Sequence, residues 1–90
     1  LDVTHIPCRG DYFRLRTRAR FARPIYPVPD PNEGGLGIHL TLGLDGVLRL
    51  GPDADWDCSR SDHEPRPEKA ATFASSVSSW LYPIHASELE

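Results

Sequence analysis

The sequence predicts an α+β fold in which an antiparallel β-sheet packs against one amphipathic helix. Apolar and polar residues alternate between positions 37 and 44, which is the period of a strand with one buried face. Asp45-Gly46 interrupts this alternation and apolar residues return at 47–51, the pattern of a β-hairpin. Between positions 67 and 81, apolar residues recur at intervals of three and four, which predicts a helix with one buried face.

Two further strands are expected on the N-terminal side of the hairpin. Residues 9–16 alternate so that Phe13 and Leu15 share one face. Residues 21–28 are extended but contain prolines, which lack the N–H that a central strand must donate. We therefore expect 21–28 to be an edge strand or a polyproline-like run. Residues 30–35 are rich in Gly, Pro, Asp and Asn and predict a loop.

The hairpin has two possible registers. A two-residue turn at Asp45-Gly46 would place Arg49 opposite Leu42, on the leucine face, where an unpaired charge is costly. A three-residue loop with Gly46 in the left-handed conformation places Leu48 opposite Leu42 instead. Because a one-residue slip moves every side chain to the other face, we predict the second register. The polar face then collects His39, Thr41 and Arg49.

The predicted helix covers residues 67–81. Pro67 is tolerated in a first turn and Glu68 suits the positive end of the helix dipole. The opposite side of the helix is rich in serine, a poor helix former, so packing of the apolar stripe must hold the helix. That stripe contains Ala70, Phe73, Ala74, Val77, Trp80 and Leu81.

Size and charge limit the class of protein. Ninety residues make one domain or less, with a net charge of −3. An arginine-rich stretch at 14–23 contains one aromatic residue, Phe21, and lacks the series of interleaved aromatic residues that stack on successive bases, so nucleic-acid binding is not expected. No apolar run is long enough to span a membrane.

A chain this short has a thin stability margin, so we expect it to rely on a partner surface. Unpaired strand edges at 12–15 or 38–44 would favour a homodimer, as would the helix stripe if the small sheet left it uncovered.

Two cysteines, Cys8 and Cys58, lie far apart and neither belongs to a C-x-x-C pair, so no metal site is expected. A disulfide is possible by count alone. Because we find no signal peptide, we favour free thiols in a reducing compartment and expect a cytoplasmic protein.

Four blocks in a fixed order resemble a known family. These blocks are Arg9-Gly10-Asp11-Tyr12-Phe13, Ile25-Tyr26-Pro27-Val28-Pro29-Asp30-Pro31, Gly35-Leu36-Gly37-Ile38-His39-Leu40-Thr41 and Gly51-Pro52-Asp53-Ala54-Asp55-Trp56. Together they resemble the substrate-binding domain of FAD-dependent oxidoreductases of the D-amino-acid-oxidase-like superfamily, in the branch of the L-2-hydroxyglutarate dehydrogenases. The resemblance covers roughly residues 7 to 82.

The resemblance implies that residues 1–90 are one fragment of a substrate-binding domain. The parent would oxidise a 2-hydroxy acid by hydride transfer to FAD held by a separate Rossmann-like domain, which is absent here. The chain has no G-x-G-x-x-G turn between a strand and a helix, and its glycine cluster at 34–37 precedes a strand. We therefore expect no cofactor-binding residues, no FAD bound to this chain and no activity of the chain alone. The alternative is a stand-alone small binding or interaction module without catalysis.

The candidate site follows from the resemblance and the hairpin register. His39 is the candidate catalytic residue, since the resemblance implies a position near the flavin face and a histidine exchanges protons near neutral pH. Arg49 could clamp a carboxylate, with Thr41 beside it. Tyr26, Arg9 and Tyr12 are further candidate substrate-binding residues. The alternative for each is an ordinary structural role, as a strand residue whose polar atoms are satisfied or as a solvated surface residue.

Overall fold

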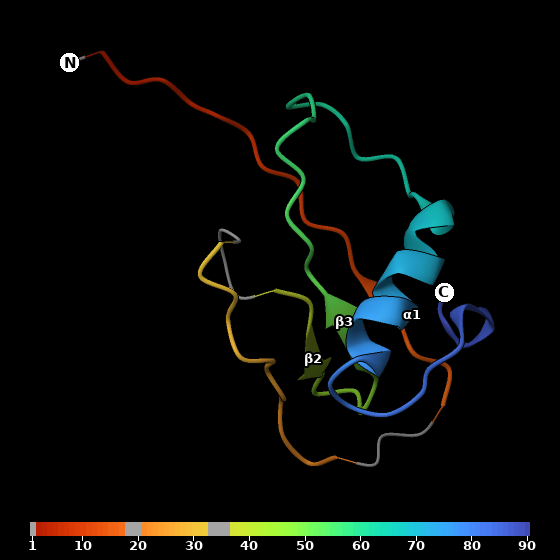
Figure 1. Cartoon of the computed structure of the whole chain (residues 1–90). Coiled ribbons are helices and arrows are strands. Elements are labelled where there is room, and N and C mark those ends of the chain that lie inside the picture. Colours follow the sequence, from red (N-terminus) through yellow and green to blue (C-terminus); the bar gives the residue numbers. More distant parts are fainter. Residues whose placement is uncertain (1, 18–20, 33–36) are drawn as a thin grey trace.

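A computed structural model describes residues 2–17, 21–32 and 37–90 of the chain. Its elements are the strands β1 (Phe13–Arg14), β2 (His39–Leu42) and β3 (Leu48–Gly51), the helix α1 (Ala70–Ser78), and the 3-10 turns η1 (Pro67–Lys69) and η2 (Ala86–Glu88) (Figure 1). The predicted α+β class, an antiparallel sheet with one helix, is confirmed.

The sheet has the strand order β1-β3-β2, and both pairings are antiparallel. The hairpin adopts the predicted register, with Leu42 opposite Leu48 and Thr41 opposite Arg49. The N–H of Gly43 donates to the carbonyl of Val47 at 2.9 Å, and Gly46 has φ +79°. As the three-residue loop Leu44-Asp45-Gly46 requires, Leu44 opens the loop and is fully exposed. The loop ends the strand alternation one residue earlier than the apolar pattern suggests.

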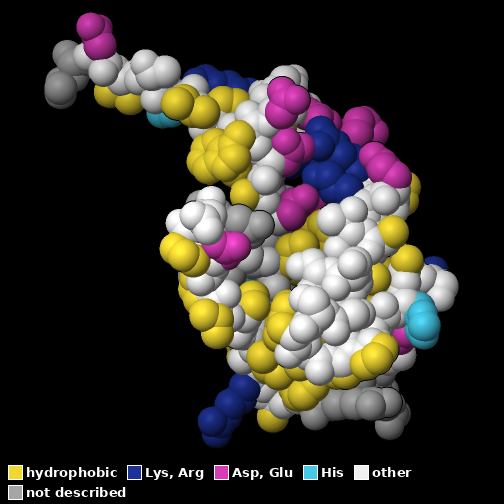
Figure 2. All heavy atoms as spheres, viewed as in Figure 1, with side chains coloured by type: hydrophobic (Ala, Val, Ile, Leu, Met, Phe, Trp, Pro, Cys, Tyr) yellow, Lys and Arg dark blue, Asp and Glu magenta, His cyan; other side chains and the backbone are white. Residues whose placement is uncertain are grey.

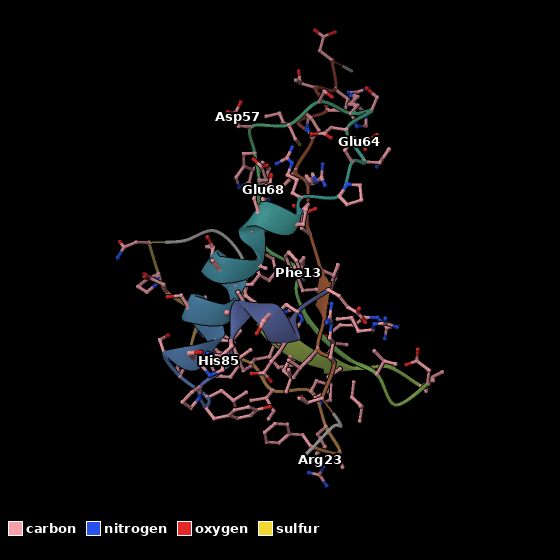
Figure 3. All side chains as sticks on the ribbon, turned by 90° about the vertical axis from the view of Figure 1, so that its right-hand side faces the viewer. Phe13, Arg23, Asp57, Glu64, Glu68 and His85 are labelled. Atoms are coloured by element: carbon pink, nitrogen blue, oxygen red, sulfur yellow. The ribbon has the colours of Figure 1, made fainter. Side chains whose placement is uncertain are left out.

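The core lies between the sheet and α1, which covers one sheet face in Figure 1. Phe13 and Phe73 meet edge to face with ring centroids 4.8 Å apart, on the side of β1 that faces the helix (Figure 3). Leu40, Leu48 and Leu50 are almost completely buried beneath them. Burying such side chains contributes about 1.5–3 kcal/mol each, which is why the serine-rich helix persists.

The helix proper is shorter than the predicted range 67–81. Its first turn is the 3-10 turn η1, and its last α-helical residue is Ser78. The hydroxyl of Ser78 accepts a hydrogen bond from the N–H of Ile84 at 2.8 Å and so holds the chain as it turns back past Pro83. Trp80 therefore lies in the turn after the helix, half-buried, rather than in the buried stripe with Val77.

Residues 21–28 do not form the predicted strand. Only Ile25 pairs, through two hydrogen bonds of 2.8 and 2.9 Å with Leu40 at the outer edge of β2. Pro24 and Pro27 flank this position and have no N–H, so the ladder cannot extend in either direction. Residues 9–16 likewise form only the two-residue β1, with isolated bridges at Arg9 and Leu15.

The sheet edges are covered by the chain itself. Beside β1, the N–H and carbonyl of Arg14 bond to those of Glu90, and Arg16 donates to the carbonyl of Glu88. Ile25 covers the middle of β2. Phe73 and Val77 are also buried, so the surfaces that suggested a homodimer are largely occupied. Within the described residues, no helix is long and apolar enough to cross a membrane.

Candidate substrate groove

An open groove with a volume of about 720 Å³ lies beside the first residue of β2. Its walls come from the loop at 27–30, the segment 37–39, the segment 52–56 and one side of α1. Figure 2 shows the hollow between that loop and the helix. The lining is mixed, with indole rings from Trp56 and Trp80, the hydroxyls of Thr72 and Ser76, and two carboxylates. A cavity of this size with a few polar groups is typical of a small-molecule site.

His39 lies in this groove and its ring is held on two sides. Nδ1 is 3.2 Å from the carbonyl oxygen of Gly37, and the ring is 4.5 Å from that of Tyr26, with 30° between the planes. Because a carbonyl can only accept, Nδ1 must be the donor in this bond. In the neutral ring, Nε2 then has a lone pair available for another donor.

Tyr26 is just over half exposed, at 54%, and supports His39 through its ring. The single bridge between Ile25 and Leu40 brings this tyrosine to the edge of β2, next to His39. Of the six residues selected from the sequence, His39 and Tyr26 are therefore the two that meet beside the groove.

Thr41 and Arg49 lie opposite each other on neighbouring strands, as the register predicts, but they do not line the groove. The Arg49 guanidinium binds the carboxylate of Asp45 at 3.1 Å, across the hairpin loop. The hydrogen bond from Arg49 lowers the pKa of Asp45. Arg49 therefore already holds a carboxylate that belongs to its own chain.

Arg9 and Tyr12 also lie away from the groove. Tyr12 is exposed beside Gly51, whereas Arg9 binds Asp11 and Asp62, the latter at 2.8 Å. Arg9 also donates to the backbone carbonyl of Glu64. These contacts show a structural role for Arg9 in this chain.

Arg9 belongs to an ionic cluster that sequence reasoning missed. The cluster comprises Arg9, Arg66 and Lys69 with Asp11, Asp53, Asp55 and Asp62. Lys69 Nζ is 2.6 Å from a carboxylate oxygen of Asp11 and 2.9 Å from one of Asp53. Figure 3 shows the polar side chains crowded at this end of the molecule, which also bears Asp57 and Glu64. Asp62 and Arg66 are four residues apart, but they lie in a segment without helix, so the spacing rule for helical ion pairs could not have indicated this contact.

Hydrogen bonds control the protonation of the ionic cluster. Those from Arg66 are the main reason that the pKa values of Asp55 and Asp62 are lowered. For Asp11, burial raises the pKa, but the bonds from Lys69 and Arg9 outweigh it and the pKa is lowered. For Lys69, burial lowers the pKa and the bonds to Asp11 and Asp53 more than restore it. Asp11, Asp55, Asp62 and Lys69 are therefore charged near neutral pH.

The described residues do not fit the diphosphate of FAD. Glycines with positive φ in the described chain are Gly37, Gly46 and Gly51, and each lies in a loop or at a strand end. Helix α1 instead follows Pro67 and the turn η1, without the glycine turn that brings a phosphate onto a helix N-terminus. Residues 34–36 of the glycine cluster lie outside the described chain.

Comparison with known proteins identifies similar sequences. No protein-family model matches the chain. It is 30% identical over 105 aligned residues to the mitochondrial L-2-hydroxyglutarate dehydrogenase of Arabidopsis thaliana, covering 100% of this chain and 21% of that protein. It is 43% identical over 56 residues to the L-2-hydroxyglutarate dehydrogenase of Indibacter alkaliphilus, covering 60% of the chain and 14% of the relative.

A third relative is the L-2-hydroxyglutarate dehydrogenase of Escherichia coli strain K12, with 40% identity over 62 residues, covering 67% of this chain and 15% of that protein. The chain thus spans about a fifth or less of the length of these curated relatives.

Proposed function

Because this chain is related to a short part of the L-2-hydroxyglutarate dehydrogenases, we propose that it is the substrate-side segment of an FAD-dependent oxidoreductase for a small 2-hydroxy acid. The flavin would be bound by a separate FAD-binding domain of the same protein, since the described residues offer no diphosphate site. The proposal includes a reducing compartment for the two free cysteines. The cytoplasm is the expectation from sequence, although the Arabidopsis relative is mitochondrial by name.

The observation that supports this function is the placement of His39. The ring lines the groove, and its Nδ1 bond and the Tyr26 contact fix its orientation. A neutral histidine with Nε2 unprotonated accepts a hydrogen bond from a substrate hydroxyl and can take its proton. A 2-hydroxy acid presents such a hydroxyl next to a carboxylate, which suits His39 as the base and orienting group.

The charges of the groove limit how the substrate carboxylates would be held. Asp30 and Asp53 line the groove, Asp53 being paired with Lys69, and no Lys or Arg lines the groove among the described residues. The required cations would come from Arg49, after release from Asp45, or from parts of the protein beyond this chain. Arg49 and Thr41 therefore remain candidate substrate-binding residues, and Asp45 would compete with a substrate carboxylate for Arg49.

The role of His39 is tested by substituting it in a longer protein that contains this segment. His39→Asn should lower kcat for L-2-hydroxyglutarate by about 100-fold or more, the usual range for loss of a general base. His85→Asn is a matched control, because His85 is exposed, lies outside the groove and has a capping role that asparagine preserves. Equal kcat for the two variants would rule out a catalytic role for His39.

A second prediction comes from the described residues, which offer no diphosphate site. Titration of the 90-residue chain with FAD, followed by flavin fluorescence, should show no saturable binding at micromolar concentrations. In the sequence, the glycine cluster at 34–37 precedes the strand β2 instead of opening a helix, which is not the order of a phosphate-binding glycine turn. Saturation with one FAD per chain would mean that this segment belongs to the flavin site.

A stand-alone binding module is the second candidate function. One observation favours it: the chain buries its own helix stripe and covers both sheet edges, as an independent module must. In that case the groove would bind its ligand without flavin, and His39→Asn would weaken binding in the isolated chain.

A further inference from the structure

The two cysteines, distant in sequence, line one small pocket. This pocket has a volume of about 240 Å³ and lies between the N-terminal segment and the irregular segment after residue 57. Cys8 is exposed and Cys58 is half-buried, and both are free thiols. The charged and titratable side chains of Arg9, Arg60, Asp62 and His63 also line the pocket.

Backbone and side-chain contacts hold the two segments together. Arg9 and Asp55 exchange two hydrogen bonds of 2.8 Å each, one residue after Cys8 and three before Cys58. Arg9 also binds Asp62, and Arg60 donates to the carbonyl of His5 at 3.3 Å. The fold therefore brings both cysteines to one pocket, although 50 positions separate them in the sequence.

We propose that Cys8 and Cys58 form a redox-switchable disulfide. Cys58 lies in a stretch without helix or strand, so it can adjust to the short Cα separation that a disulfide demands without disturbing the core. In a reducing compartment the bridge would form only under oxidising conditions. It would close a loop that contains the whole sheet, and closing a long loop restricts the unfolded chain strongly.

The chemistry is ordinary thiol–disulfide exchange with a small disulfide such as oxidised glutathione. The exposed Cys8 thiolate attacks one sulfur of glutathione disulfide, forms a mixed disulfide and releases one glutathione thiolate. The Cys58 thiolate then attacks the Cys8 sulfur and releases the second glutathione. Two protein thiols become one disulfide, and the two electrons and two protons reside on two glutathione molecules.

The bridge would also affect the groove. Trp56 lies between Asp55 and Cys58 and lines the groove while remaining 62% exposed. A disulfide at Cys58 would restrain Trp56 from the C-terminal side. The pairing of Asp55 with Arg9 already restrains Trp56 from the N-terminal side. The oxidation state of the pair would thus set how freely one wall of the groove moves.

The test equilibrates the full 90-residue chain with reduced and oxidised glutathione, followed by acid quenching and intact mass analysis. The main product should be a monomer lighter by two hydrogen atoms. A peptide map made without reductant should show the peptides of Cys8 and Cys58 linked, and dithiothreitol should separate them. The glutathione equilibrium gives the effective concentration of one cysteine thiol at the other. This effective concentration should be at least about tenfold higher in native buffer than in denaturing urea. Equal values in both conditions, or glutathione adducts or covalent dimers as main products, would overturn the proposal.

Two variants complete the test. Cys8→Ser and Cys58→Ser should each abolish the intramolecular product and leave a glutathione adduct on the remaining cysteine. In a Trp80→Phe background, Trp56 is the single tryptophan, and its fluorescence anisotropy should rise on oxidation of the pair and return on reduction. Thermal unfolding of the unsubstituted chain should shift to higher temperature when oxidised. A shift of the same size in either serine variant would contradict a Cys8–Cys58 bridge.

Discussion

At the scale of single residues, the sequence predicts what depends on neighbours and misses what depends on distant partners. The hairpin register, with Thr41 opposite Arg49, could be predicted because it depends on the length of the short loop between the two strands. The ionic contact of Arg9 with Asp62 could not be predicted, because its partner is 53 positions away. A lone arginine in a sequence does not indicate whether it will bind a substrate or a carboxylate of its own chain.

Two glycines give a residue-scale prediction. Both have positive φ, +79° at Gly46 and +135° at Gly51. A Cβ at Gly46 would meet nothing within 4 Å, whereas one at Gly51 would lie 2.5 Å from the backbone oxygen of Asp11. Gly46→Ala should cost about 1 kcal/mol from backbone strain alone, and Gly51→Ala about 3 kcal/mol or more. Urea unfolding measures both, and equal costs would show that the close contact with Asp11 is absent in solution.

At the scale of elements, local patterns predict the hairpin and helix well. The alternation in β2 and β3 and the spacing in α1 each depend on fewer than about fifteen residues, the range over which periodicity is informative. The extended stretch around Ile25 fails as a strand because prolines remove its donors. The helix ends early because the Ser78 hydroxyl binds Ile84, a contact that periodicity does not encode.

The ionic cluster gives a prediction at this scale, because it joins the start of the helix to residues 9–11, which precede β1, and to the 53–66 segment. The lowered pKa of Asp11 means that the folded state binds fewer protons than the unfolded chain. This contribution to stability is therefore present above the ordinary value of 3.8 and is lost as the pH falls through the lower folded value. Lys69→Met should cost about 1–2 kcal/mol near neutral pH.

Urea unfolding at a series of pH values measures this effect. The difference between Lys69→Met and the unsubstituted chain should shrink as the pH falls below about 4, where unfolded aspartates take up protons. Arg14→Met is the control, since Arg14 forms its pair with Glu90 at 55% side-chain exposure and such pairs contribute little. A pH-independent cost for Lys69→Met would attribute its effect to packing instead of charge.

At the scale of the whole molecule, the four sequence blocks predicted a resemblance to the L-2-hydroxyglutarate dehydrogenases, and the similarity of the chain to part of three such enzymes confirms that resemblance. The shape could not be predicted in the same way. The radius of gyration is 14.2 Å, compared with about 12 Å for a compact chain of this length. The N-terminal arm extends from the body in Figure 1 and leaves Val3 and Ile6 exposed.

The oligomeric state gives a prediction at this scale, and the structure favours a monomer over the homodimer expected from the sequence. Glu90 covers β1 and Ile25 covers β2, so the edges that would recruit a second copy are occupied. We therefore expect a monomer in sedimentation equilibrium at tens of micromolar, in place of the homodimer suggested by sequence alone. A dimer that dissociates in a variant lacking Val3 and Ile6 side chains would place the contact on the N-terminal arm.

Exchange of the matching segment in the Escherichia coli relative tests the central claim most directly. Replacing that segment with this chain preserves the surrounding enzyme and asks only whether the groove with His39 can serve a 2-hydroxy acid. The chimera, once shown by absorbance to hold flavin, should oxidise L-2-hydroxyglutarate, and His39→Asn should abolish that turnover. A folded, flavin-loaded chimera that binds the substrate but does not turn it over, or one whose turnover is unaffected by His39→Asn, would contradict the account.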